Sequence, residues 1–236
     1  FTFCALATTG RDVRFDVSRV EGYRNFCNKL WNASKFVLMN TEHTDLRLTE
    51  QPSSHVIDRW IAAKARQLIE DCHLALETYR FDLCANAIYE FVWHEYCDWY
   101  LELSKSIFWD DNIGVEQQAA TRRTLLQVLE SLLRISHPIM PFITETLGHQ
   151  VAPRLGVEGT SIMTQSFPEA ASCKADEEAE QQIEWLKAVI TALRNIRGEA
   201  SIKPSQGIDV VLQDGDQSDR IQASNAEEML KRLANV

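Results

Sequence analysis

The chain has 236 residues, of which 45% are hydrophobic and 25% charged, and its formal net charge is −10. These proportions are typical of globular proteins, and no apolar run reaches the roughly 18 residues that a membrane-spanning helix needs. With only nine glycines and six prolines, the composition disfavours a sandwich or barrel built from many tight turns, and the negative charge argues at first sight against nucleic-acid binding.

The ends of the chain and its cysteines suggest its context. The sequence starts at Phe1 rather than Met and stops within a predicted helix, so we expect an internal segment of a longer protein. None of the six cysteines forms a CxxC pair, and most lie in apolar helical patterns. Free thiols in a reducing compartment fit this usage better than a disulfide framework, which predicts a cytoplasmic protein.

The first two thirds of the chain predict a helical bundle. Residues 1–16 are expected to be a connector from a preceding domain, and residues 17–155 form the predicted bundle. Apolar residues recur there at helical spacing, interrupted by prolines and polar turns. The expected helices cover residues 18–40, 54–79, 82–106, 116–136 and 141–153. A polar loop follows the first helix, and N-caps are expected within residues 52–54 for the second helix and at Asp82 for the third.

Residues 156–236 predict a linker and a small α/β appendage. A helix is expected over residues 176–198, followed by a short strand at 208–212, where apolar residues lie between two glycine-containing turns. Ser224 and Glu227 have the spacing of a capping box, which predicts a last helix from that point. The sequence therefore predicts a mainly α protein whose β structure is confined to its last third.

A line of polar and aromatic residues lies on the first bundle helix, away from its apolar stripe. An α-helix turns by 100° per residue, so residues that are seven or eleven positions apart lie almost in line along the same side of the helix. The residues aligned in this way, with two that flank them, are Asn25, Lys29, Asn32, Phe36, Asn28 and Lys35. Amides that read base edges, ammonium groups for phosphates and a ring for stacking are what an unpaired RNA loop requires, and the window 11–35 has a net charge of +3. Taken alone, such a pattern is more often a solvated helix face.

Two other clusters have a structural explanation that we favour. Residues 79–109 contain ten aromatic side chains, which could form a stacking platform but fall mostly at core-like spacing. Glu90, His94, Cys97 and Asp98 share one helix face, yet a zinc site usually needs a second pair of ligands and none follows. The sequence has no phosphate-binding loop, nucleophile elbow or acid–base constellation, so we predict neither a catalytic centre nor a metal site.

Four stretches of the sequence carry a family resemblance. They are Ala7–Asp12 (ATTGRD), Tyr23–Asn40 (YRNFCNKLWNASKFVLMN), Tyr89–Lys105 (YEFVWHEYCDWYLELSK) and His137–Glu145 (HPIMPFITE). Through these stretches the chain resembles the region that follows the catalytic domain in bacterial valyl-tRNA synthetases.

The resemblance implies a class I aminoacyl-tRNA synthetase anticodon-binding helical bundle, whose first helix meets the anticodon loop of tRNA(Val). It also implies an enzyme that ligates valine to tRNA, using ATP and Mg²⁺ in a separate catalytic domain. The whole enzyme is expected to be monomeric, cytoplasmic and not bound to a membrane, and this segment to be non-catalytic and free of cofactors. The motif positions that meet the anticodon in the family are Arg24, Asn25, Lys29, Lys35 and Phe36, to which the helical wheel adds Asn32. Because these positions lie off the apolar stripe, substitutions there are expected to leave folding nearly intact.

The sequence departs from the family at several points. The ATP-site signatures His-Ile-Gly-His and Lys-Met-Ser-Lys-Ser are absent, as is a C-terminal coiled coil. Family members often carry arginine in place of Lys35, which keeps the charge but lacks the planar guanidinium that stacks on bases. They also often carry an aromatic residue in place of Gly148, so the fifth helix of this chain is expected to pack differently. The related isoleucyl enzymes carry a cysteine-rich tail that has no counterpart after Cys173.

Two other functions stay open at this point. One is a helical protein-interaction module, which the net charge of −10 favours. The other is a metal-dependent helical-bundle enzyme. Three cations near the end of the 176–198 helix, Arg194, Arg197 and Lys203, are expected to lie at a solvated helix end rather than on tRNA.

Overall fold

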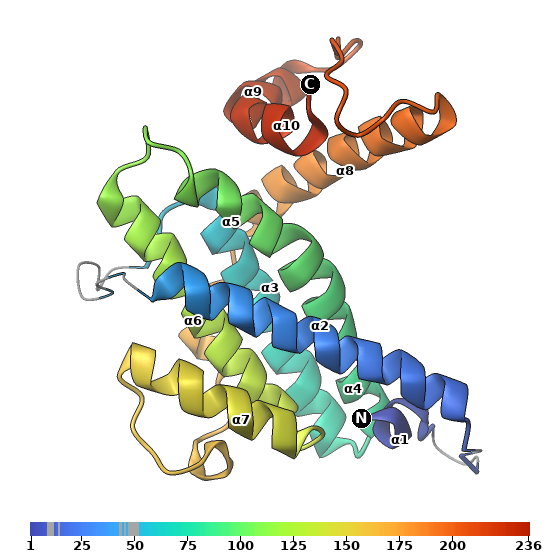
Figure 1. Ribbon diagram of the computed structural model, residues 1–236, viewed down its shortest axis with the longest axis vertical. Coiled ribbons are helices and arrows are strands. Elements are labelled where there is room, and N and C mark those ends of the chain that lie inside the picture. The colour runs from blue at the N-terminus through green and yellow to red at the C-terminus, as the bar shows by residue number, and fades with distance from the viewer. Residues whose placement is uncertain (9–11, 14, 43, 45, 47–51) are drawn as a thin grey trace.

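Helices dominate the computed structural model, which describes residues 1–8, 12–13, 15–42, 44, 46 and 52–236 (Figure 1). The α-helices are α1 (Thr2–Leu6), α2 (Val17–Thr41), α3 (Val56–Glu77), α4 (Phe81–Glu90), α5 (Leu101–Phe108), α6 (Val115–Ser136), α7 (Pro141–Val151), α8 (Glu177–Glu199), α9 (Gln217–Asn225) and α10 (Glu227–Ala234). A π-helical segment, η2 (Phe91–Tyr100), joins α4 to α5, and three short 3₁₀ turns are η3 (Ala152–Leu155), η4 (Ile162–Thr164) and η5 (Ala170–Ser172). The mainly α prediction is confirmed.

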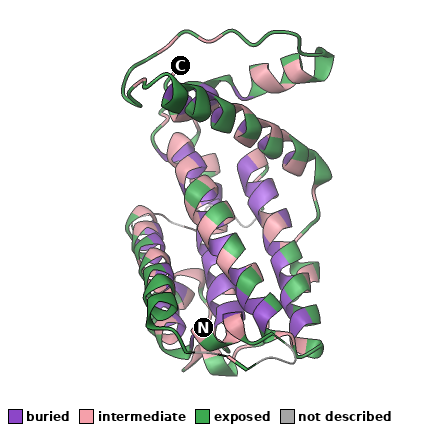
Figure 2. Ribbon diagram, turned by 90° about the vertical axis from the view of Figure 1, so that its right-hand side faces the viewer, coloured by how far each residue is buried: buried purple, intermediate pink, exposed green. Residues whose placement is uncertain are grey.

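The five helices expected in the bundle are present, with ends within a few residues of the prediction. The third is one continuous rod, α4–η2–α5, and it packs with α3 and α6 around a single core, across which α2 and α7 lie (Figure 1). Buried residues line the interior of this bundle, whereas the segment that follows α8 is mostly exposed (Figure 2). Within the described part of the chain, no helix is both long enough and apolar enough to cross a bilayer.

The carboxylate of Asp58 joins three helices inside this core. It is 2% exposed, and it accepts hydrogen bonds from Tyr100 Oη at 2.6 Å, from Thr121 Oγ1 at 2.6 Å and from Ser53 Oγ. Burial raises the pKa of Asp58, although the three hydroxyl donors and His55 oppose that rise. Among the described residues no cation bonds to it, so the carboxylate depends on hydroxyl groups from η2, α6 and the loop before α3.

Several predicted local details are wrong. The α3 cap is His55, whose ring nitrogen accepts from the Ile57 N–H, because Ser53 is engaged with Asp58. Asp82 does not cap α4; instead it pairs with Arg80 at 2.7 Å inside the first turn. At the C-terminus the capping box is Asp216 with Asp219, which opens α9, rather than Ser224 with Glu227.

The predicted strand at 208–212 is also absent, since none of the described residues forms a strand and this segment has no regular secondary structure. The expected α/β appendage is therefore helical. Parts of the predicted connector (residues 9–11 and 14) and of the polar loop (43, 45 and 47–51) lie outside the described residues.

The last helices are attached to the bundle through α8 and through α10, which packs against α5. The first half of α8 pairs with α3 and η2 through Lys64–Glu180 at 2.8 Å and Lys187–Glu95 at 2.9 Å. Its second half carries Arg197, which is 6% exposed and donates to the backbone oxygens of Lys203, Gln206, Ala234 and Asn235. The expectation of a solvated helix end is therefore wrong for Arg197, whereas Arg194 and Lys203 are exposed.

Close packing explains the glycine at position 148. A Cβ added to Gly148 would clash with Cδ1 of Ile162, so the η4 turn packs directly on the backbone of α7. In this chain, Ile162 therefore occupies space that a larger side chain at position 148 would need.

The raised pKa of Asp58 predicts a pH-dependent contribution to stability. Because the native state favours the protonated carboxyl, this contribution is complete below the ordinary aspartate pKa and is lost as pH rises through the raised native value. Asp58→Asn removes the titration but keeps a polar group in place. We expect the free energy of unfolding of the native chain, relative to Asp58→Asn, to fall as pH rises above about 4. Urea denaturation of both proteins across this range measures the difference, and a rise with pH would contradict the assignment.

Candidate nucleic-acid interface

Helix α2 presents one continuous polar face to solvent. Its apolar face is fixed in the core by Phe26, Leu30 and Val37, all 0% exposed. The opposite side, which we call the α2 stripe, consists of the exposed residues Glu21, Arg24, Asn25, Asn28, Asn32, Lys35 and Met39. These positions repeat every three or four residues, so they lie along one side of the helix. The helix crosses the front of the bundle in Figure 1, and all seven of these residues are exposed.

The two cations of the α2 stripe are available for a ligand. Within the described residues, neither Arg24 nor Lys35 has an ion-pair partner, and Lys35 Nζ lies 5.6 Å from the ring centroid of Trp31 in the same helix. Many other cations of the bundle are paired, including Lys64 and Lys187. A chain with net charge −10 therefore exposes unpaired positive charge on this helix.

Two of the six predicted contact residues lie at the edge of the α2 stripe and are engaged with the neighbouring rod. Lys29 is half-buried, with its Nζ 2.5 Å from Asp98 Oδ1 and 4.0 Å from the ring centroid of Trp93. Phe36 is also half-buried and packs against the core, and Lys105 Nζ lies 5.4 Å from its ring centroid. The structure thus brings Arg24, Asn25, Asn32 and Lys35 together on the open side of α2, whereas Lys29 and Phe36 face η2 and α5.

Two arginines that the sequence did not single out hold the end of α2. Arg154 Nη1 donates to Leu38 O at 3.0 Å, and Arg122 Nε donates to Asn40 O at 3.0 Å. Carbonyls at a helix C-terminus lack intrahelical donors and carry partial negative charge, which guanidinium groups satisfy. These arginines are 116 and 82 residues from their acceptors, so no local pattern could have revealed them.

The aromatic cluster is largely structural, as predicted. Phe91, Tyr96, Tyr100 and Phe108 are buried at 6% exposure or less. Tyr89, Trp93 and Trp99 are half-buried and pack against the same core, whereas Tyr79, Phe81 and Trp109 are exposed.

The neighbouring acidic cluster is poorly suited to bind a metal. His94 lies 3.6 Å from both Glu90 and Asp98. Burial raises the pKa of the Cys97 thiol to about 12, so it stays protonated and is a poor metal ligand. Among the residues that the structure describes, no three histidine, cysteine or acidic side chains are placed to hold a metal ion.

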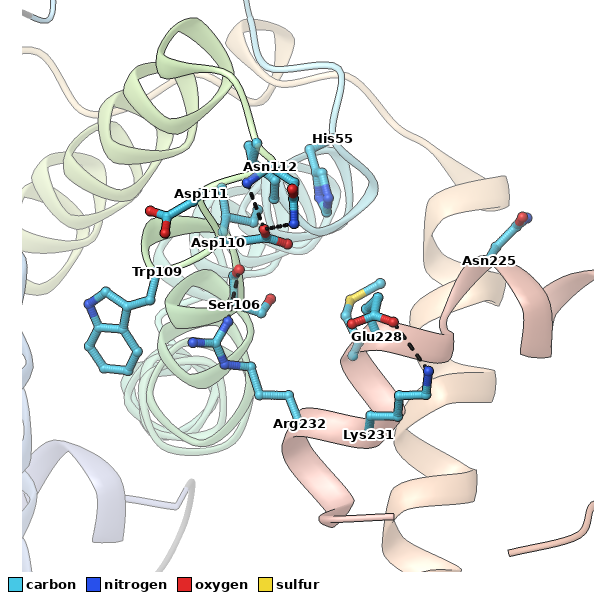
Figure 3. A pocket seen from close by; sticks show the side chains of 13 residues that line it. His55, Ser106, Trp109, Asp110, Asp111, Asn112, Asn225, Glu228, Lys231 and Arg232 are labelled. Carbon is cyan, nitrogen blue, oxygen red and sulfur yellow. Dashed lines mark hydrogen bonds and ion pairs between the residues drawn. The ribbon is translucent and has the colours of Figure 1, made fainter.

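A cavity between the α5–α6 loop and α10 is a weaker candidate for an RNA site (Figure 3). Its volume is about 740 Å³, and the carboxylates of Asp110, Asp111 and Glu228 lie in its lining. Its cations are already engaged, since Lys231 lies 2.7 Å from Glu227 and Arg232 donates to Ser106 O at 3.1 Å. Phosphate would meet carboxylates there, which leaves the α2 stripe as the better candidate.

Comparison with known proteins gives one family and a consistent set of relatives. A family model described as the anticodon-binding domain of tRNA ligases matches residues 58–212. Over its whole length the chain is 47% identical to a valine–tRNA ligase of Coxiella burnetii and 45% identical to one of Acinetobacter baylyi. It covers 26% and 24% of those proteins, and so spans about a quarter of the length of the curated relatives it matches.

The half-buried position of Phe36 predicts that the expected tolerance to substitution does not extend to this residue. Phe36→Ala removes a ring that packs against the core, and we expect it to lower the free energy of unfolding by about 1–3 kcal/mol, less than full truncation of a core phenylalanine costs. Asn32→Ala, on the open side of the same helix, should change it by less than about 0.5 kcal/mol. Chemical denaturation of the two variants measures the contrast, and equal stabilities would contradict the packing role.

Proposed function

Because the chain belongs to the anticodon-binding domain family of tRNA ligases, we propose that it is the tRNA-recognition part of a valine–tRNA ligase. The valine specificity is supported by relatives of that name, which match the chain over its whole length. In the proposed whole enzyme, a separate catalytic domain uses ATP and Mg²⁺ to join valine to tRNA(Val). We also propose that this enzyme is cytoplasmic and monomeric.

The observation that carries the proposal is the α2 stripe with its unpaired cations. Arg24 and Lys35 lie about 16 Å apart along the helix axis, and each can pair with a phosphate of the anticodon loop. Asn25, Asn28 and Asn32 lie on the same side of the helix. Their amides can both donate to and accept from the edges of unpaired bases, the groups through which single-stranded RNA is read by sequence.

Lys29 and Phe36 have a different part in the proposal. Because Asp98 neutralises Lys29, the ammonium group contributes less to phosphate binding than Arg24 or Lys35 does. Phe36 can offer a base only the exposed part of a ring that is otherwise packed against the core. We therefore propose that Lys29 and Phe36 form the edge of the interface next to η2 and α5 and make few direct contacts with RNA.

The proposed contacts predict separable effects on RNA binding. Arg24→Ala and Lys35→Ala should each reduce the salt dependence of affinity, by about 0.7 in the logarithmic slope for each single-strand phosphate that is no longer neutralised. Asn25→Ala should instead reduce discrimination between the valine anticodon and an altered one. Titration of a tRNA(Val) transcript between about 50 and 200 mM salt measures the slopes.

The matched control is Lys174→Ala, which removes an exposed cation far along the chain from α2 and should leave the slope unchanged. A tRNA changed at the middle and third anticodon bases tests specificity. If the native chain binds both tRNAs equally and the α2 variants bind as it does, α2 does not read the anticodon. That outcome would favour a protein-interaction module.

A further inference from the structure

The segment between α8 and α9, drawn as an orange-to-red coil in Figure 1, leaves a run of backbone groups open. Among the described residues, no hydrogen bond reaches the N–H or C=O of any residue from 207 to 213. None of these seven residues has a positive φ, so the backbone can adopt a β conformation without strain. A row of open backbone donors and acceptors is what the edge of a β-sheet presents to an incoming strand.

The side chains of this segment alternate as they do in a strand with one apolar face. Ile208 and Val210 are half-buried, whereas Asp209 between them is exposed. Leu212 continues the apolar series and is 53% exposed. Because successive side chains of a strand point to opposite faces, Ile208, Val210 and Leu212 would share one face. A partner strand that extends this face would carry apolar residues at alternate positions.

One guanidinium group holds the start of this segment beside the end of α10. Arg197 Nη1 donates to Gln206 O at 2.7 Å, and Arg197 Nη2 donates to Asn235 O at 2.8 Å. The Asn235 side chain also donates to Pro204 O at 3.1 Å. Asn235 has a φ of 55°, the left-handed conformation in which helices commonly end and the backbone turns away from the helix axis. Backbone that continues from α10 would therefore start next to the open segment.

This arrangement fits a parallel pair of strands. Two strands that leave the same point side by side run in the same direction, and parallel neighbours need a crossover of a dozen or more residues, which is usually helical. Residues 213–236 provide such a crossover, because α9 and α10 lie within them. A second copy of the chain is a poorer partner, since it lacks the high effective concentration of a segment in the same polypeptide.

From these features we propose that residues 208–212 form a β-strand in the whole enzyme, paired in parallel with an apolar strand that follows α10 in the longer polypeptide. The chain spans about a quarter of the length of its relatives, which leaves length for such a strand. Together with α9 and α10, the two strands would make a β–α–β unit. This inference rests on the proposed function only in taking the chain as one part of a longer enzyme.

Amide hydrogen exchange, followed by mass spectrometry, tests the proposed pairing. In the present chain the amides of residues 208–212 should exchange as fast as those of an unstructured peptide. In the whole enzyme, the amides that face the partner strand should exchange about a hundredfold more slowly. A chain that continues past residue 236 by about 15 residues of the enzyme, enough for a short connection and one strand, should already show this slow exchange.

Substitutions at two neighbouring positions separate backbone pairing from side-chain packing. The N–H groups of consecutive strand residues point to opposite sides, so Val210→Pro combined with Val211→Pro removes one that faces the partner, whichever side the partner takes. In the whole enzyme this double variant should abolish the slow exchange of the segment. The matched control, Val210→Ala with Val211→Ala, keeps both N–H groups and should retain it. In the present chain the proline variant should leave the melting temperature nearly unchanged, because these N–H groups bond to none of the described residues.

Three results would overturn the inference. The first is fast exchange of residues 208–212 in a whole enzyme that ligates valine, which would leave the proposed function standing. The second is slow exchange in the whole enzyme but not in the chain that continues past residue 236, which would place the partner strand elsewhere. The third is slow exchange in the present chain that grows with protein concentration and accompanies a dimer, which would make a second copy the partner. Slow exchange in a whole enzyme that neither binds tRNA(Val) nor ligates valine would overturn the proposed function alone.

Discussion

The position of α2 depends on two guanidinium groups that come from distant parts of the chain. Arg122 of α6 and Arg154 of η3 donate to the last carbonyls of α2, where the helix dipole is negative. At the other end, Asp16 caps the first turn by accepting from the Ser18 N–H. With its core face anchored by Leu30 and its ends tied in this way, α2 can present a polar side at a fixed angle. Rigid placement matters for RNA recognition, because a side chain reads a base edge only if it is held within hydrogen-bond reach.

Net charge is a poor guide to what this chain can bind. The total of −10 includes many carboxylates that are matched locally, such as Glu180 by Lys64 and Glu95 by Lys187. What a ligand meets is the local balance, since exposed charges more than about a Debye length apart, roughly 8 Å at physiological ionic strength, are largely screened from one another. A ligand that approaches the α2 stripe meets the unpaired cations Arg24 and Lys35, whereas one that approaches the cavity beside α10 meets carboxylates. The open side of α2 and the cavity beside α10 therefore suit different partners.

The bundle could be predicted because its helices carry their own periodic apolar faces, whereas the errors arose where distant partners decide the outcome. The 208–212 segment has apolar residues suited to a strand, but a strand also needs a neighbour for its N–H and C=O groups, and the described residues offer none. The hydrogen bonds of Asp58 reach 42 and 63 residues along the chain, beyond any local pattern. For Phe36, the helical wheel placed the ring on the polar line, away from the apolar stripe, whereas the structure packs it half-buried against the core. The wheel could not show that η2 and α5 cover the edge of α2 where Lys29 and Phe36 lie. The assignment of the RNA-binding residues itself stays a prediction.

The buried guanidinium of Arg197 ties the last turn of α8 to the end of the chain. Its acceptors lie up to 38 residues farther along the chain. Until those residues have been synthesised, Arg197 is hydrated and its hydrogen bonds do not stabilise the last turn of α8. The first half of α8, by contrast, closes over α3 as soon as the bundle forms. During synthesis from the N-terminus, the bundle and the start of α8 can therefore consolidate first, and the tail closes afterwards, when Arg197 gains its acceptors and α10 packs on α5. In the folded protein the same division should appear as two classes of amide hydrogen exchange within one continuous helix, slow before the middle of α8 and faster beyond it.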